Sequence, residues 1–270
     1  MLTLLVNGEP ADQQDLLHLA LVNYGAFTSM QAEQGADGAW GVRGLDLHLA
    51  RLDAWGHELF GAAPDQDAVR GWMRRALEDQ SGAASIRVNL FGRGLSVRDP
   101  SAMGAPDVMV MAGPAAAPVT EPLKLTVRRH QRMAPHIKHV ATYELISARR
   151  AAMQAGHDDV LFADEAGRVS EGSIWNIGFL EGDTVVWPDA PMLEGTGQAL
   201  IQRGLEAVEV ATERRRIDLS ELSGFDAAFI TNSAIPAAPV GAVGAVRYPE
   251  RPDLIQLLRN AWRSNPCQAV

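Results

Sequence analysis

The chain has 270 residues, of which 47% are hydrophobic and 21% are charged, as in a globular protein with one large domain or two smaller ones. Its net charge of -9 argues against nucleic acid or an anionic membrane surface as a partner, because both attract basic patches. No apolar run approaches the roughly 20 residues of a membrane-spanning helix. The single cysteine, Cys267, excludes a disulfide within the chain, so a reducing cytoplasm is the expected location.

The first 112 residues are predicted to combine strands with amphipathic helices. Apolar residues recur at helical spacing from Leu45 to Phe60, and Gly61 follows directly as a typical helix end. The strand at 27–31 is expected to pair with the segment 40–42 across the polar turn at 33–38. The other elements predicted in this half are strands at 3–7, 84–91 and 108–112 and a helix at 68–77.

The segment 113–122 contains three prolines in ten residues and is the predicted linker. Beyond it we expect a helix at 141–154 that Gly156 ends. The turns DEAG and EGD predict two hairpins, and the other predicted elements are strands at 123–127 and 227–231 and helices at 196–208 and 253–263. The sequence therefore predicts an α+β fold, with an N-terminal domain at 1–112, the linker at 113–122 and a C-terminal domain at 123–270.

Lysine is nearly absent from this chain. Of its 24 basic residues only Lys124 and Lys138 are lysines, and a preference for arginine at the surface explains most of that bias. Arginine stays charged and cannot form a Schiff base, whereas a buried lysine can lose its proton. If the protein carries out imine chemistry, only these two side chains can hold the cofactor.

Five motifs occur in an order that is specific as a set. HLARL begins at His48, and HIKHVATYELISARRAAMQAGHDDVLFAD begins at His136. GRVSEGSIWNIGF, LEGTGQALI and FITNSAIPAAPV follow in the second half of the chain. Together they resemble the class IV aminotransferases, a family that includes branched-chain and D-amino-acid aminotransferases and aminodeoxychorismate lyases.

The resemblance implies a fold type IV enzyme that uses pyridoxal 5'-phosphate. Such enzymes have two α/β domains with the active site at their interface, and they are homodimers. Lys138 corresponds to the Schiff-base lysine, and Glu171 to the carboxylate that faces the pyridine nitrogen and keeps it protonated. Tyr143, five residues after Lys138, corresponds to the tyrosine that hydrogen-bonds the phenolic oxygen of the cofactor.

The resemblance also implies a phosphate site. Thr196 and Gly197 stand at the predicted start of a helix, where free backbone N–H groups and the helix dipole favour an anion. Arg51 of HLARL corresponds to the arginine that pairs with the phosphate. Ser233 corresponds to a hydroxyl in the last motif, and Asn232 precedes it.

The chain departs from the family pattern in several places. Its helix starts Gly195-Thr196-Gly197-Gln198, where the family usually has glycine, isoleucine, threonine and arginine, and Thr142 replaces a common asparagine. Arg98 resembles, by its spacing, the arginine with which D-amino-acid aminotransferases bind the substrate carboxylate. The seven histidines show no metal-ligand spacing, so no metal is predicted.

Three functions remain open at this point. The first is transamination between an amino acid or amine and a 2-keto acid, in which Lys138 moves the proton of the α-carbon. The second is an aminodeoxychorismate lyase reaction that releases pyruvate. Tyr143 and the SEG motif favour the transaminase, whereas the compact length and the FTS strand favour the lyase. The third is a scaffold that has lost catalysis and binds a partner, for which the altered phosphate helix is the motive.

Overall fold

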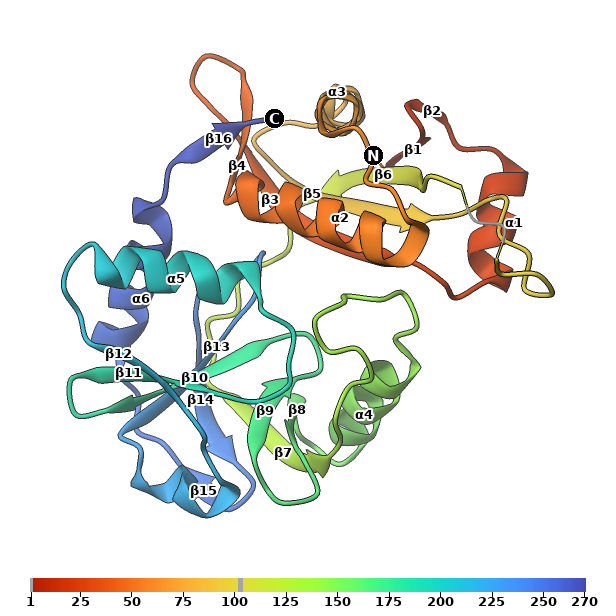
Figure 1. The fold of residues 1–270 in the computed structure, drawn as a ribbon. Helices are drawn as coiled ribbons and strands as arrows, with labels where there is room; N and C mark the ends of the chain where they lie inside the picture. Colours follow the sequence, from red (N-terminus) through yellow and green to blue (C-terminus); the bar gives the residue numbers. More distant parts are fainter. Residues whose placement is uncertain (1, 102–103) are drawn as a thin grey trace. The chain divides into compact units, whose positions relative to one another are not determined.

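The computed structural model describes residues 2–101 and 104–270, which form two compact units (Figure 1). The first unit comprises the chain up to Ala117 together with Ile137–Ala141 and Pro266–Val270. The second comprises Pro118–His136 and Thr142–Asn265. Two short segments that follow the predicted linker in sequence, one of which contains Lys138, are thus part of the first unit.

The first unit is built on an antiparallel sheet with the strand order β16-β4-β3-β5-β6-β1-β2. The predicted pairing of β3 with β4 is confirmed, but Glu33 and Gln34 still belong to β3, so the turn before β4 is 35–39. The C-terminal strand β16 pairs with β4, which explains why the end of the chain belongs to this unit. The strands are β1 (Thr3–Val6), β2 (Glu9–Pro10), β3 (Ala26–Gln34), β4 (Trp40–Arg43), β5 (Ala83–Phe91), β6 (Asp107–Pro114) and β16 (Cys267–Ala269).

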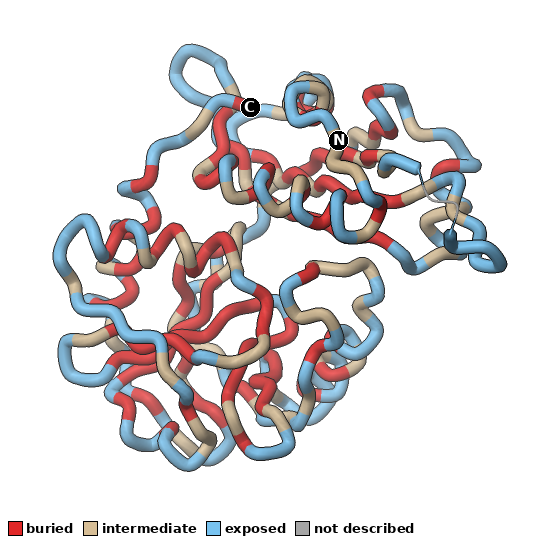
Figure 2. The backbone as a smooth tube through the Cα atoms, in the orientation of Figure 1, coloured by how far each residue is buried: buried red, intermediate tan, exposed pale blue. Residues whose placement is uncertain are grey.

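One face of this sheet is covered by two helices, and Figure 2 shows the buried strands beneath them. Helix α2 (Leu45–Phe60), predicted to the residue, packs on β3, and α3 (Gln66–Leu77) packs on β1 and β6. Side chains alternate between the faces of a strand, so every second residue points to the helices. Those of β3, β5 and β6 are almost completely buried and, except for Thr28, apolar: Ala26, Thr28, Met30, Ala32, Ala84, Ile86, Val88, Leu90, Val108, Val110 and Ala112.

Helix α1 (Gln13–Leu21) was not predicted. Asp12 caps its first turn, and its only buried residue is Asp15, whose carboxylate pairs with Arg93 at 3.0 Å. Leu17 and Leu21 are exposed. This helix therefore buries a charged anchor and turns leucines outward, the reverse of the usual amphipathic pattern.

The sheet of the second unit closes on itself. Its strand order is β12-β11-β10-β13-β14-β7-β8-β9, and β9 also pairs with β10 through Glu171 and Asn176. Both predicted hairpins, β8–β9 and β10–β11, are confirmed. The strands are β7 (Leu123–Arg129), β8 (Asp159–Ala163), β9 (Val169–Gly172), β10 (Asn176–Glu181), β11 (Thr184–Pro188), β12 (Thr212–Arg215), β13 (Ala227–Thr231), β14 (Ala238–Val243) and β15 (Val246–Arg247).

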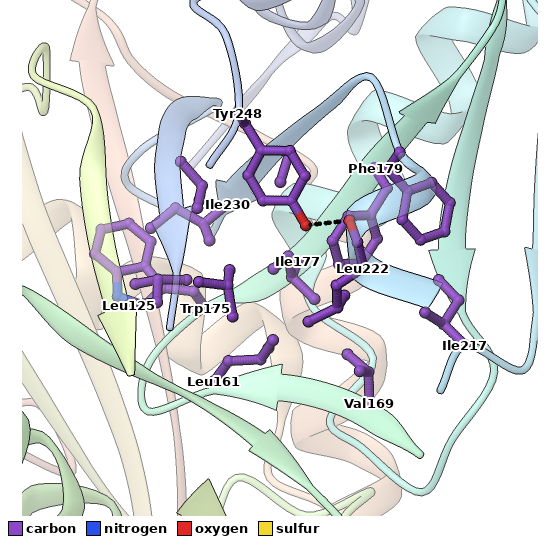
Figure 3. Close-up of a cluster of buried hydrophobic side chains, with 14 of the residues drawn as sticks. Leu125, Leu161, Val169, Trp175, Ile177, Phe179, Ile217, Leu222, Ile230 and Tyr248 are labelled. Carbon is purple, nitrogen blue, oxygen red and sulfur yellow. Dashed lines mark hydrogen bonds between the residues drawn. The ribbon is translucent and has the colours of Figure 1, made fainter. Parts of the chain in front are cut away.

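Closure of this sheet encloses a hydrophobic core (Figure 3). Leu125, Leu161, Ile177 and Ile230 from four different strands belong to it, and each is at most 2% exposed. The hydroxyl of Tyr248 is buried at the edge of this cluster and donates to the Leu222 carbonyl at 2.8 Å, which satisfies its polar end.

Three α-helices and a short 3-10 helix complete the second unit. Helix α4 (Tyr143–Gln154) packs on β7 and β8, and α5 (Thr196–Glu206) packs on α6 (Pro252–Ser264). A Cβ atom on Gly204 would lie 1.9 Å from the Ala261 carbonyl oxygen, so only glycine permits that contact. The 3-10 helix is Leu219–Gly224. Among the residues described, no helix is both long and apolar enough to cross a membrane.

Candidate active site

Lys138 lies beside the free edge of β3 in the first unit. The Phe27 N–H donates to the Lys138 carbonyl at 2.9 Å, and the Val140 N–H donates to the Gly25 carbonyl at 3.0 Å. Antiparallel pairing of this kind puts Lys138 opposite Phe27 and on the same face of the sheet. The Lys138 Nζ is accordingly 5.1 Å from the centre of the Phe27 ring. The backbone therefore fixes which way the lysine points.

Arg87 shares the Phe27 ring with Lys138. The guanidinium carbon of Arg87 lies 3.6 Å from the ring centre, and its Nε donates to the Asn89 Oδ1 at 2.8 Å. Burial lowers the pKa of Arg87. No carboxylate among the described residues forms an ion pair with it. A cation with only neutral partners beside Lys138 can bind a carboxylate, and the sequence analysis did not identify it.

Arg51 is a second arginine of the first unit with neutral partners. Its Nε donates to the Thr28 Oγ1 at 2.8 Å, and its Nη2 makes a second hydrogen bond to the same oxygen. The Thr28 Oγ1 is also 2.6 Å from the His48 Nδ1. The Trp55 ring centre lies 5.1 Å from the guanidinium carbon of Arg51. Burial lowers the pKa of Arg51 to about 9, which fits a cation that no neighbouring carboxylate compensates.

Glu171 is a buried carboxylate on β9 of the second unit. Its Oε1 accepts a hydrogen bond from the Leu193 N–H at 3.3 Å and lies 3.9 Å from the Nε of Arg132. Both side chains of this ion pair are almost completely buried. Burial lowers the pKa of Arg132, and the Glu171 charge acts in the opposite direction. A guanidinium and a backbone N–H donor thus both face the carboxylate at position 171.

The chain directly after Glu171 is held by the buried carboxylate of Asp159. The Ser173 hydroxyl donates to its Oδ1 and the Trp175 indole N–H donates to its Oδ2, both at 2.6 Å. The Arg149 Nε lies 3.6 Å from the same carboxylate. These contacts fix the turn between β9 and β10 and, with it, the end of the strand that carries Glu171.

Glu171 is connected to the start of helix α5. The Leu193 N–H donates to Glu171, and the Leu193 carbonyl accepts from the Asn176 Nδ2 at 2.8 Å. This pair of bonds anchors the loop that leads into Gly195. A Cβ atom on Gly195 would lie 1.8 Å from the Asn176 Oδ1, so the loop needs glycine there.

Gly197 brings the start of α5 against the end of β13. A Cβ atom at this position would lie 2.4 Å from the Asn232 carbonyl oxygen and 2.7 Å from the Thr231 Oγ1. The structure thus places Thr196 and Gly197 next to the loop of Asn232 and Ser233, as the phosphate motifs imply. It also gives a reason for Gly197, because a threonine in its place would collide with that loop.

Asn232 shapes the loop that follows β13. Its Oδ1 accepts from the N–H groups of Ala234 and Ile235, both at 2.9 Å, and its backbone N–H donates to the Ile235 carbonyl at 3.0 Å. This is the turn chemistry typical of asparagine. Asn232 therefore holds the turn in which Ser233 stands.

The remaining residues singled out in the sequence are Gln198, Tyr143 and Arg98, of which the first is buried and the other two are exposed. Gln198 in the first turn of α5 is 5% exposed, and its Oε1 has no hydrogen-bond partner among the described residues. Tyr143 is the first residue of α4 and is 76% exposed. Arg98 is exposed in the loop between β5 and β6.

In the described part of the chain, no group of three or more His, Cys, Asp or Glu could hold a metal ion.

The chain matches a known family model over most of its length. Residues 25–243, most of the chain, match the model of the class IV aminotransferases. The chain belongs to the class IV aminotransferase family. The resemblance found in the five motifs is confirmed, and the protein is an aminotransferase. Enzymes of this family use pyridoxal phosphate. No curated protein sequence matches the chain.

Solved structures agree with this assignment at the level of the fold. The branched-chain amino acid aminotransferase of Escherichia coli is 18% identical with a TM-score of 0.83, and the match covers 97% of this chain and 93% of the other. The fold IV-transaminase CpuTA1 of Curtobacterium pusillum is 22% identical with a TM-score of 0.76, over 96% of this chain and 98% of the other. A hypothetical aminotransferase of Mycobacterium tuberculosis is 19% identical with a TM-score of 0.78, over 98% of this chain and 99% of the other. The predicted fold type IV is confirmed.

Proposed function

We propose that this aminotransferase moves an amino group between an amino acid and a 2-keto acid with pyridoxal 5'-phosphate bound covalently to Lys138. The observation that carries the proposal is the contrast between the two lysines. Lys124 is exposed on β7, whereas Lys138 is half-buried, held by β3 on one side and directed at the Phe27 ring. The bound cofactor would supply an acceptor for the electrons of the substrate's α-carbon.

Glu171 and Tyr143 are the proposed partners of the cofactor ring. Glu171 would hold a proton at the pyridine nitrogen, and the strand β9 together with the Leu193 N–H and the nearby Arg132 would hold its carboxylate in place. Tyr143 would donate to the phenolic oxygen, and its hydroxyl stands at the start of α4, where it is exposed.

The phosphate would be held by backbone and side-chain donors. We assign to it the free N–H groups of Thr196 and Gly197 in the first turn of α5, the Ser233 hydroxyl in the loop that Asn232 shapes, and the Arg51 guanidinium. Arg51 fits this role because its buried charge has no carboxylate partner among the described residues. An anionic ligand would supply that missing compensation.

Lys138 would also move the proton. Its Nζ would take the proton from the α-carbon of the amino acid and later return it, which is the task of a general base positioned at the reacting carbon. For the substrate carboxylate, the half-buried Arg87 beside Phe27 is a second candidate in addition to Arg98. The protein would then select amino acids rather than simple amines.

The first test is the near-visible absorption spectrum of the protein with pyridoxal phosphate. Lys138→Ala removes the proposed anchor, and Lys124→Ala is the matched control, because it removes the only other lysine. We expect a band that borohydride fixes in the wild type and in the control but not in Lys138→Ala. If Lys124→Ala loses the band instead, the assignment of Lys138 is wrong. No band at saturating cofactor would favour the non-catalytic scaffold.

Incubation with an amino donor alone identifies the reaction. A transaminase forms about one keto acid per active site without an acceptor and then stops, because the amino group remains on the cofactor. Continuous release of pyruvate from aminodeoxychorismate without any acceptor would instead indicate the lyase. We expect the single turnover.

We further propose that the protein is a cytoplasmic homodimer. Exposed apolar side chains support an interface, namely Leu17 and Leu21 on α1 and Ile146 and Met153 on α4. The lone cysteine, Cys267, suits a reducing compartment. Sedimentation at micromolar concentration should give twice the mass of 29.1 kDa, and a monomer would contradict the assembly.

A further inference from the structure

A polar group occupies the otherwise apolar layer between helix α2 and the sheet of the first unit. Thr28 on β3 is completely buried and His48 on α2 is 1% exposed. Arg51 follows His48 by one helical turn and reaches the same hydroxyl. Polar side chains in such a layer destabilise a protein unless they are hydrogen-bonded to one another. Their presence here calls for a role beyond packing.

Two N–H groups of Arg51 donate to the Thr28 Oγ1 and so occupy both of its acceptor positions. Arginine has donors and no acceptor, so the Thr28 Oγ1 must accept from Arg51. The hydroxyl proton of Thr28 is then directed to the His48 Nδ1, 2.6 Å away. His48 must accept at Nδ1, and its own proton is therefore on Nε2. The three side chains form a chain of donors from Arg51 through Thr28 to His48.

This chain fixes the orientation of the guanidinium. The Nε and Nη2 of Arg51 are engaged by the Thr28 oxygen, and the Nη2 is also 3.3 Å from the His48 Nδ1. The guanidinium is planar, so holding one edge determines where the Nη1 group points. Among the described residues, the Nη1 group donates no hydrogen bond and no carboxylate pairs with it.

We propose that Thr28 and His48 are positioning residues, which hold Arg51 so that its remaining N–H groups bind the phosphate of the cofactor. The inference rests on the proposed function for the identity of the ligand. Thr28 provides the oxygen that anchors the guanidinium, and His48 determines that the lone pairs of that oxygen face Arg51. Neither residue needs to touch the phosphate.

The test separates the phosphate from the rest of the cofactor. Dissociation constants of pyridoxal phosphate and of pyridoxal, which lacks the phosphate, are measured for the apo-protein of each variant. Thr28→Val is isosteric but has no hydroxyl, and Thr28→Ser keeps it. We expect Thr28→Val to lower the preference for pyridoxal phosphate over pyridoxal by about tenfold, whereas Thr28→Ser stays within about threefold of the wild type.

Other outcomes would overturn the inference. An unchanged preference in Thr28→Val would do so, and so would equal weakening of both ligands, which indicates a purely structural role. If Thr28→Val does not fold, His48→Leu removes the acceptor of the Thr28 proton and should lower the same preference. No change of the preference in that variant would likewise refute the proposal.

Inorganic phosphate gives a readout that does not depend on the cofactor. A ligand that binds only the folded state raises its Tm, so phosphate should raise the Tm of the wild type and of Thr28→Ser but not of Thr28→Val. A wild type that binds neither form of the cofactor would refute the proposed function, and the phosphate shift would still decide the inference. An equal shift in Thr28→Val, or no shift in any of the proteins, would refute the positioning role.

Discussion

Arg132 in the second unit and Arg51 in the first are both largely shielded from water, but they have different partners. Arg132 lies beside the Glu171 carboxylate at 3.9 Å. Arg51 has the Thr28 hydroxyl and the neutral His48. A buried charge without an opposite charge is costly, and it persists where a ligand supplies the compensation. The comparison therefore supports the proposal that Arg51 binds an anion, whereas Arg132 has the protein's own Glu171 beside it.

The same difference extends to a second pair of residues. In the second unit, the buried Asp159 has Arg149 at 3.6 Å and two hydrogen bonds from side chains. In the first unit, the partners of Arg87 among the described residues are Asn89 and the Phe27 ring. The second unit thus balances these charges internally, whereas the first leaves two cations for anionic groups of a ligand. A cofactor phosphate and a substrate carboxylate are two such groups.

Glu171→Gln should cause the largest loss of activity, because it removes the carboxylate that lies beside Arg132 and is proposed to face the cofactor ring. A neutral amide cannot hold a proton at the pyridine nitrogen, so kcat should fall on the order of 10²- to 10⁴-fold. Arg132 would then lose the Glu171 charge at 3.9 Å. Steady-state kinetics and a thermal melt of the same sample measure both effects. Unchanged kcat would exclude Glu171 from the cofactor site.

Arg87→Gln tests whether the first unit binds the substrate carboxylate. The loss of a charged hydrogen bond corresponds to roughly 1.5–3 kcal/mol, so KM for an amino acid should rise about 10- to 100-fold. KM for an amine without a carboxylate should not change. Arg98→Gln is the matched variant in the exposed loop. If Arg98→Gln rather than Arg87→Gln raises KM, the spacing argument from the sequence identifies the correct arginine.

The sequence predicted elements well wherever periodicity and burial agree. Apolar residues recur at helical spacing over residues 45–60, and this segment forms α2 with the predicted ends. Helix α1 was not predicted, because its leucines face outward and its buried residue is Asp15. The hydrophobic residues of this helix therefore do not mark its buried face. The C-terminal strand β16 escaped because its partner β4 lies more than 200 residues earlier.

The site was predictable to the extent that it consists of motifs. Roles for Lys138, Glu171 and Arg51 could be named from resemblance alone, and these roles stay predictions. Arg87 could not, because its significance comes from the Phe27 ring that it shares with Lys138, and a sequence does not show which side chains meet. The unusual Gly197 is explained only by the Asn232 carbonyl, which folding brings within 2.4 Å of its Cβ position.

Asp159→Asn tests the internal balance of the second unit. The amide can keep its oxygen towards Ser173 and the Val160 N–H, but its NH2 group then faces the indole N–H of Trp175. Two buried donors would face each other, so the free energy of unfolding should fall by about 1–3 kcal/mol. Denaturant titration measures this change.

The adjacent Asp158 provides the control for that variant. It is exposed, and within the described part of the chain its Oδ2 accepts only from the Lys124 N–H at 2.7 Å, a role that an amide oxygen can keep. Asp158→Asn should therefore change stability by less than about 0.5 kcal/mol. If the two variants are equally stable, Asp159 does not fix the turn that follows Glu171.

The smallest expected effect is on the pH dependence of stability, and it comes from His48, the neutral partner of Arg51. Burial, and secondly the charge of Arg51, lower the pKa of His48 well below its ordinary value. The unfolded chain therefore binds this proton more readily than the folded one, and stability falls as the pH drops below about 6.5. One such group contributes a slope of at most about 1.4 kcal/mol per pH unit. His48→Gln does not titrate and keeps an acceptor for Thr28, so its stability should fall less steeply.

His57 on the same helix gives the matched comparison, because its side chain is 61% exposed. Chemical denaturation at pH 7, 6 and 5 should show a shallower slope for His48→Gln and a slope like that of the wild type for His57→Gln. Equal slopes in all three proteins would mean that folding does not lower the pKa of His48, which would then carry its proton at pH 5 in the folded state as in the unfolded one. A protonated Nδ1 cannot accept the hydroxyl proton of Thr28, so this outcome would contradict the chain of donors from Arg51 through Thr28 to His48.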